Sequence, residues 1–163
     1  VRGAFENMMN EPIQMVILGT GDVSYEGYFK DMEEKYPHKV RAIISYNQDL
    51  SRKIYGSCDF FLMPSKSEPC GLSQMIASRY GTIPVVRETG GLKDSIHKFE
   101  GNKGNGYTFA GENPYDLLQT LKQALADYQN KEVHLDHVNK VIKTDFGWSA
   151  SAKSYIKMYK KFD

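Results

Sequence analysis

The sequence predicts an α/β fold, a Rossmann-like, doubly wound parallel sheet with a helical C-terminal segment. Short, continuous apolar runs recur in the first half of the chain, and segments with helical spacing of apolar residues separate them. Continuous apolar runs are typical of parallel strands that are covered on both faces. The alternation of strands and helices favours parallel strands joined by helical crossovers. With 163 residues, the chain is long enough for one domain, and we expect 1–163 to form it.

The apolar runs define the expected strands, four in the first half of the chain at 15–18, 42–44, 60–63 and 83–86. Pro84 lies in the fourth run and has no backbone N–H, so we expect it at the start of that strand or on a sheet edge. A loop rich in Gly, Asn and Lys follows at 98–106, and a further short strand is expected at 106–109.

Segments of helical character lie between and after these strands. The segment 25–36 carries Tyr28, Phe29 and Met32 at helical spacing and ends before Pro37. A shorter helix is expected at 49–55, and 72–80 carries an apolar stripe that Gly81 closes. Three amphipathic helices complete the chain, at about 115–128, 132–143 and 149–160.

Composition and charge narrow the classes of partner. Lys and Arg number 21 against 20 acidic residues, so the formal net charge is only +1. This balance argues against a nucleic acid or a membrane surface as the main partner. No apolar run approaches the roughly 20 residues of a membrane-spanning helix. Cys58 and Cys70 show no Cys-x-x-Cys spacing. A reduced, cytoplasmic protein is expected, and one disulfide between them is the alternative. The start at Val1, without an initiator Met, suggests a fragment.

The stretch from Pro64 to Gln74 carries the clearest chemical signal because it follows a buried strand and opens a helix. Ligands of open α/β sheets bind at the carboxyl ends of strands, and a helix start favours phosphate. Gly71 permits close approach to the backbone, so the N–H groups of Leu72 and Ser73 are expected to face a diphosphate. Glu68 is placed to accept hydrogen bonds from sugar hydroxyls. The alternative is an ordinary strand–loop–helix connection.

Further loops are expected at the same edge of the sheet. Thr89, Gly90 and Gly91 follow the fourth run, and their glycines permit a tight turn near a ligand. The loop 19–22 follows the first run but lacks the full Gly-x-Gly-x-x-Gly pattern, so a dehydrogenase is not favoured. Tyr46 follows the second run, where its ring could stack on a nucleobase. A partly buried rim tyrosine is the alternative.

Three segments together resemble a known family. Glu-Pro-Cys-Gly-Leu-Ser-Gln at 68–74, Tyr-Gly-Thr-Ile-Pro-Val-Val-Arg at 80–87 and Thr-Gly-Gly-Leu at 89–92 resemble the C-terminal domain of bacterial glycogen synthases and plant starch synthases. The ending that starts with Asp-Phe-Gly-Trp at 145–148 is similar to that family's C-terminal helix. The likeness extends from about 16 to 159. It implies the C-terminal half of a GT-B fold, in which two Rossmann-like domains face each other across a cleft.

The resemblance implies a retaining enzyme that transfers glucose from ADP-glucose to the non-reducing 4-OH of an α-1,4-glucan. The resemblance also implies a role in the donor site for each residue that matches the family's motifs. The implied contacts with glucose are Glu68, also the implied catalytic residue, Cys70 and Gly71. The implied contacts with the diphosphate are Leu72, Ser73, Thr89, Gly90 and Gly91. The implied contact with the nucleobase is Tyr46. No cofactor is implied, and no metal either, since the chain has no Asp-x-Asp motif.

Two departures from the family pattern bear on these expectations. A second glutamate, found in wider retaining GT-B families, is replaced by Ile76. The implied Arg and Lys that clamp the donor phosphates would precede Val1, as would the domain for the glucan acceptor. We therefore expect a fragment with the donor site that is inactive by itself and whose partners are ADP-glucose, the glucan and the absent N-terminal domain.

Other interpretations remain open. The chain could be a non-catalytic module that binds nucleotide or glucan, or another GT-B glycosyltransferase, and the residues do not separate ADP-glucose from UDP-glucose. A phosphorylase would need a lysine for pyridoxal phosphate, for which no motif is found. His134 and His137 are three residues apart and could share a helix face as metal ligands, but a solvated helix is favoured because no further ligand accompanies them.

Overall fold

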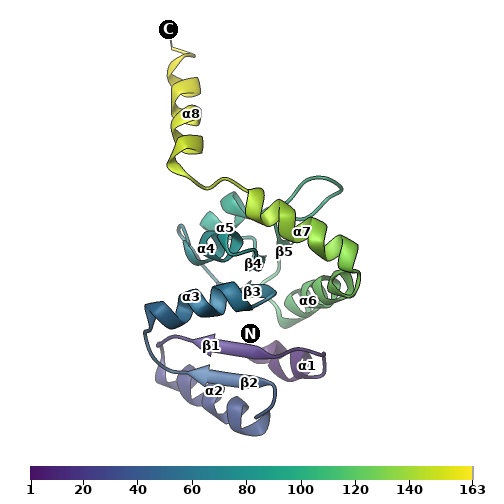
Figure 1. Cartoon of the computed structure of the whole chain (residues 1–163). Coiled ribbons are helices and arrows are strands. Elements are labelled where there is room, and N and C mark those ends of the chain that lie inside the picture. Colours follow the sequence, from purple (N-terminus) through teal and green to yellow (C-terminus); the bar gives the residue numbers. More distant parts are fainter. Residues whose placement is uncertain (163) are drawn as a thin grey trace.

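Five strands form two separate parallel sheets in the computed structural model, which describes residues 1–162 (Figure 1). The first sheet pairs β1 (Met15–Leu18) with β2 (Val40–Ile43). The second places β4 (Ile83–Arg87) between β3 (Phe60–Met63) and β5 (Tyr107–Phe109). The α/β class, the parallel pairing and all five strands are confirmed. The single continuous sheet is not, because β1 and β3 do not pair in the described chain.

A helix follows each of the first four strands. They are α2 (Val23–Lys35), α3 (Gln48–Ser57), α4 (Ser73–Arg79) and α5 (Gly90–Ser95). The C-terminal segment contains α6 (Pro114–Gln129), α7 (Lys131–Lys143) and α8 (Trp148–Tyr159), as predicted to within a few residues. Local capping explains this success for α6 and α7, whereas α8 has no side-chain cap. Asn113 accepts a hydrogen bond from the Asp116 amide at 2.9 Å, and Pro114 takes the first helical position.

Three short elements were not predicted. The 3-10 helix η1 (Arg2–Ala4) and helix α1 (Phe5–Met9) have no side-chain cap, so the sequence gives no start signal for either. Helix α5 begins with Gly90 and Gly91, which sequence reasoning assigned to a turn. Tertiary packing stabilises α1, since Phe5 and Met8 are fully buried in the core cluster that contains Leu117 and Leu121 of α6.

The core is densest around β4, whose first four residues are buried. Pro84 is the second residue of this central strand, and pairing with β5 begins only at Val85. Its missing N–H therefore removes no bond from the ladder, and the expected place near a strand start is confirmed.

Helix α8 extends away from the rest of the molecule (Figure 1). Its apolar residues Trp148, Tyr155, Ile156 and Tyr159 are exposed. In residues 1–162 no helix has both the length and the apolar character that crossing a membrane requires.

Candidate functional site

The loop after β3 leads directly into α4, as the sequence predicted, and its backbone geometry depends on Gly71. This residue has φ 71°, a conformation that side-chain-bearing residues rarely adopt. A Cβ at this position would also lie 2.6 Å from Oε1 of Gln74. Glu68 is half-buried, whereas the side chains of Cys70 and Leu72 are exposed. Glycine at 71 is therefore required both by the turn and by the neighbouring side chain.

Backbone amides at the start of α4 and α5 are left without protein acceptors. Leu72 is the N-cap residue of α4 and Thr89 that of α5, and neither side chain makes a capping bond. Among residues 1–162, no acceptor bonds the amides of Leu72, Ser73 and Gly90. Unpaired amides at helix starts carry partial positive charge, and an anion can accept their hydrogen bonds. These three residues all belong to the predicted diphosphate set.

The two glycine-containing loops lie directly against each other. The amide of Gly91 donates to the carbonyl oxygen of Glu68 at 2.9 Å. A Cβ at Gly90 would overlap the same carbonyl oxygen, and one at Gly91 would overlap the carbonyl oxygen of Cys70. The glycine pair thus lets the loop of Glu68 and Cys70 pack onto the start of α5. Because its N–H is engaged in this contact, Gly91 does not present a free amide.

Gln74, a buried residue to which the sequence assigned no role, connects the two loops. Gln74 is fully buried, and its Nε2 donates to the Gly71 carbonyl at 2.8 Å and to Ser95 Oγ at 3.0 Å. The Ser95 hydroxyl in turn donates to the Gly91 carbonyl at 2.6 Å. Oε1 of Gln74 is buried and has no partner among the described residues. The predicted apolar stripe did not reveal it, because Leu72, Ile76 and Tyr80 of that stripe are exposed. The face that α4 buries carries Gln74, Ala77 and Ser78.

Arg87, at the end of β4, holds the beginning of the same loop. Its Nη1 donates to the carbonyl oxygens of Lys66 at 2.7 Å and of Ser65 at 3.3 Å. Glu112 lies 3.7 Å from Arg87 Nη2 and 3.1 Å from Lys66 Nζ. A half-buried guanidinium that binds main-chain carbonyls restricts the path of the loop. Arg87 lay within the family motif, but its role is visible only in the folded chain.

The predicted residues divide between the two sheets. Tyr46 belongs to the β1–β2 half, where it follows β2 with its side chain 87% exposed. The other eight belong to the β3–β4–β5 half. The loop 19–22 serves mainly as a helix cap, since Asp22 Oδ1 accepts from the Ser24 amide at 2.8 Å. The Gly21 amide donates to Glu26 at 2.7 Å. The structure thus brings eight predicted residues together and leaves Tyr46 on the separate sheet.

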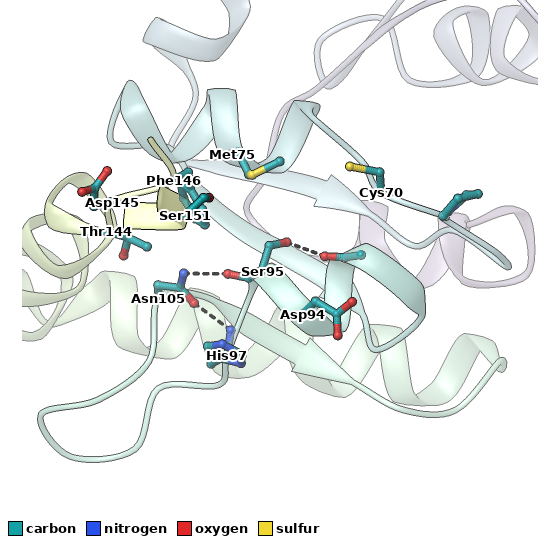
Figure 2. Close-up of a pocket in the computed structure, with 12 residues that line it drawn as sticks. Cys70, Met75, Asp94, Ser95, His97, Asn105, Thr144, Asp145, Phe146 and Ser151 are labelled. Carbon is teal, nitrogen blue, oxygen red and sulfur yellow. Dashed lines mark hydrogen bonds between the residues drawn. The ribbon is translucent and has the colours of Figure 1, made fainter. Parts of the chain in front are cut away.

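A pocket of about 500 Å³ adjoins the two packed loops (Figure 2). Cys70 and Gly91 line it, whereas Glu68, Leu72 and Ser73 do not. Asn105 helps to shape its wall by donating to the Ser95 carbonyl at 2.9 Å and accepting from the His97 amide at 2.7 Å. The pocket therefore includes the predicted sugar contact Cys70 and the predicted diphosphate contact Gly91, and it lies beside Glu68, Leu72 and Ser73.

The prediction of a solvated helix is wrong for His137. Its ring stacks on Phe99 with centroids 3.8 Å apart, and only 8% of the residue is exposed. Nδ1 lies 3.0 Å from the Tyr107 hydroxyl, which is 2.8 Å from Asp127. Burial lowers the pKa of His137 below its usual 6.5. Among residues 1–162, no group of three or more His, Cys, Asp or Glu side chains could hold a metal ion.

Parallel strands with glycine-containing loops at their carboxyl ends define a Rossmann-like α/β protein. Residues 3–140 match the family of glycosyl transferases group 1, and the chain belongs to this family.

Known proteins extend this assignment. The chain is 46% identical to a glycogen synthase of Alkaliphilus metalliredigens and 47% identical to one of Kosmotoga olearia, over 162 residues in each case. These alignments cover 98% of this chain but only 34% of each relative. The chain therefore spans about a third of the length of these proteins. The resemblance to glycogen and starch synthases is confirmed.

Solved structures agree with the fold. The catalytic domain of starch synthase IV from Arabidopsis thaliana, bound to ADP and acarbose, has a TM-score of 0.84 at 35% identity. That comparison covers 98% of this chain and 34% of the other. A sucrose-phosphate synthase from Thermosynechococcus elongatus has a TM-score of 0.67 at 19% identity, covering 96% of this chain and 40% of the other, and supports the fold alone.

Proposed function

We propose that this chain is the donor-binding part of a glycogen synthase that transfers glucose from ADP-glucose to the non-reducing 4-hydroxyl of an α-1,4-glucan, with retention of the anomeric configuration. One observation carries the proposal. Within the described part of the chain, the amides of Leu72, Ser73 and Gly90 have no acceptor at the start of two helices, beside the half-buried Glu68. The glycogen synthases at 46–47% identity make this the favoured use of such a site.

The proposed chemistry follows from the charges that develop during transfer. The diphosphate leaves as an anion, while the transferred glucose becomes electron-deficient at its anomeric carbon. Fixed N–H groups at Leu72 and Ser73 stabilise the leaving diphosphate because they need no reorganisation when the charge forms. Glu68 binds the glucose hydroxyls and offsets the positive charge on the sugar. Cys70 and Gly71 border the sugar, and Tyr46 stacks on the adenine.

The remaining parts of the proposal concern the longer protein. Residues 1–163 form one domain, and the polypeptide beyond them supplies the acceptor side and cations for the phosphates. The isolated chain then binds donor without turning it over. The reaction needs no metal, so a chelator leaves the rate unchanged, and the protein acts in the cytoplasm without a nucleic-acid or membrane partner.

A substitution at Glu68 tests the catalytic assignment in the longer protein. We expect Glu68→Ala to lower kcat by about 100-fold or more while the Kd for ADP changes much less, because the carboxylate acts on the sugar rather than the nucleotide. Incorporation of glucose into the glucan measures kcat, and calorimetry measures ADP binding. Glu100→Ala, at an exposed position in the loop before β5, is the matched control. Equal losses in turnover and ADP binding would contradict the role of Glu68.

Donor identity needs a separate measurement. Calorimetric titration of the longer protein with ADP-glucose and UDP-glucose should give tighter binding of ADP-glucose. Proton NMR of the extended glucan should show the new linkage as α, as retention requires, and as 1,4, as transfer to the 4-hydroxyl requires. Binding of both donors with no transfer would favour the non-catalytic module.

A further inference from the structure

Three charged side chains form a cluster at the beginning of the loop that carries Glu68. Arg87 extends from the end of β4, Lys66 belongs to the loop itself, and Glu112 lies in the connection between β5 and α6. The two carboxylate oxygens of Glu112 approach different cations, with Oε1 3.1 Å from Lys66 Nζ and Oε2 3.7 Å from Arg87 Nη2. Glu112 therefore connects the segment after β5 to the loop after β3. Neither the predicted site nor the family motifs include this residue.

The backbone that carries Glu112 is itself held in place. The amide of Gly111 donates to Asp116 Oδ2 at 3.1 Å. On the other side, Asn113 Oδ1 accepts from the Asp116 amide at 2.9 Å and caps α6. Both neighbours of Glu112 in the chain are thus bound to the first turn of a 16-residue helix. The carboxylate of Glu112 can therefore act as a fixed point for the loop after β3.

Arg87 needs a counter-charge because its guanidinium is largely removed from water. Its side chain is only 17% exposed, and its Nε is buried without a partner among residues 1–162. Its Nη1 binds two carbonyl oxygens, those of Ser65 and Lys66, which carry no net charge. In the described part of the chain, Glu112 is the carboxylate within 4 Å of this group. Loss of that charge would favour a guanidinium that turns outward into water and releases both carbonyls.

The loop after β3 has two anchors, and Glu68 lies between them. The first anchor is the pair of neighbouring carbonyls that Arg87 binds. The second is the Gly71 carbonyl, which accepts from the buried Gln74 at 2.8 Å. The amides at the start of α4, the proposed diphosphate contacts, follow directly after the second anchor. Release of the first anchor would therefore displace Glu68 while the diphosphate contacts stay in place.

The size of these effects separates positioning from stability. Ion pairs with an exposed partner contribute little to folding, and half of the Glu112 side chain is exposed. By contrast, a shift of about 1 Å in a reacting group can cost about 100-fold in rate. A loss of the pair should therefore appear in the rate of the reaction rather than in the stability of the fold.

We propose that Glu112 is a positioning residue for the transfer reaction. It pairs with Arg87, keeps the guanidinium on the carbonyls of the first anchor and thereby holds the Glu68 carboxylate where the glucose binds. The pair with Lys66 is mostly exposed and contributes little. The inference deepens the proposed function and rests on it, because it requires that Glu68 acts on the transferred sugar.

A variant of the longer protein can remove the charge of Glu112 with little change in size. We expect Glu112→Gln to lower kcat about 5-fold or more, while the Kd for ADP and the midpoint of urea denaturation stay nearly constant. Glu6→Gln is the matched control, because Glu6 is also an exposed glutamate and pairs with Lys35 away from the site. Its kcat should not change. Equal losses of kcat and ADP affinity in Glu112→Gln, or an unchanged kcat, would overturn the proposal.

Double variants show which cation carries the effect. If Glu112 acts through Arg87, Glu112→Gln should lower kcat no further in an Arg87→Met protein. In a Lys66→Met protein it should keep nearly its full effect. Because Lys66 is mostly exposed, this second comparison decides the question even where Arg87→Met prevents folding. An effect that disappears with Lys66→Met would assign it to the wrong cation and overturn the proposal.

Hydrogen exchange separates this proposal from the proposed function, because it needs no substrate. The Gly91 amide, which donates to the Glu68 carbonyl, should exchange about 5-fold faster in Glu112→Gln than in the unsubstituted longer protein. The Ile96 amide, which donates to Leu92 at the end of α5, is the internal control. An unchanged rate at Gly91 would overturn the role of Glu112 whether or not transfer occurs. An unsubstituted longer protein that transfers no glucose would instead contradict the proposed function.

Discussion

The β3–β4–β5 half and the β1–β2 half of the molecule present their loops in different ways. In the first, buried groups bind the loops to each other: Gln74 and Ser95 connect Gly71 to Gly91, and Arg87 binds two carbonyls. In the second, the loop 19–22 caps its own helix, and Tyr46 projects from the surface. The loops proposed to contact sugar and diphosphate are thus held by protein contacts without a ligand, whereas we expect the proposed nucleobase contact at Tyr46 to become ordered with the ligand.

The difference has a physical origin in burial. Loops that approach each other within van der Waals contact need glycine where a side chain would collide, and they need partners for each buried polar group. The β3–β4–β5 half has glycine at these close approaches. Its buried polar groups have partners, except for Oε1 of Gln74 and Nε of Arg87 among the described residues. The loops of the other half stay solvated, so their backbone groups bind water at no such cost. Substitutions in the two halves should therefore have different consequences.

The largest effect is expected at Gly91. A Cβ in Gly91→Ala would overlap the backbone carbonyl of Cys70, and no change of rotamer can relieve a clash between a Cβ and a backbone atom. We expect a loss of about 3 kcal/mol or more in the free energy of unfolding, together with loss of donor binding. Urea denaturation and calorimetric titration measure the two. Gly27→Ala, in α2 with open space around it, is the control and should be neutral or stabilising. A fully stable Gly91→Ala protein would contradict the claim that close packing of the two loops holds the β3–β4–β5 half in place.

A smaller effect is expected at Gln74. Gln74→Leu keeps a side chain of similar size but leaves the Gly71 carbonyl and the Ser95 hydroxyl without their donor. We expect a loss of about 1–3 kcal/mol in stability, the cost of one buried polar group without a partner, because the Ser95 hydroxyl keeps its bond to the Gly91 carbonyl. Urea denaturation checks this value. Gln119→Leu, at an exposed position of α6, should change stability by less than about 0.5 kcal/mol. Similar values for the two variants would show that Gln74 does not connect the loops.

The smallest effect is expected at Tyr46 and should appear only in binding. Tyr46→Ala removes an exposed ring, so the free energy of unfolding should stay nearly constant. The affinity for ADP should fall by about 1–3 kcal/mol, the usual range for one stacked base. Calorimetry of Tyr46→Phe, which retains the ring, provides the matched control. Unchanged ADP affinity in Tyr46→Ala would show that the nucleobase does not stack on Tyr46. It would also contradict the proposal that the β1–β2 half supplies the nucleobase contact.

Much of the fold could be predicted because its signals are local. The apolar runs at Met15–Leu18 and Phe60–Met63 coincide with β1 and β3. Asn113 and Pro114 mark the start of α6, and Gly81, with φ 84°, follows the end of α4. Each of these signals depends on the conformational preferences of a few adjacent residues. The short helices α1 and α5 lack such signals and depend on tertiary packing.

The sequence by itself determined the class of sheet, the order of its elements and the loops in which a nucleotide-sugar site was predicted. Only the tertiary structure decided which amides stay free. It engages Gly91 with Glu68, buries Gln74 between the two loops and encloses His137 against Phe99. These outcomes depend on contacts between segments distant in the chain, where the same residue can be solvated or buried according to what packs against it.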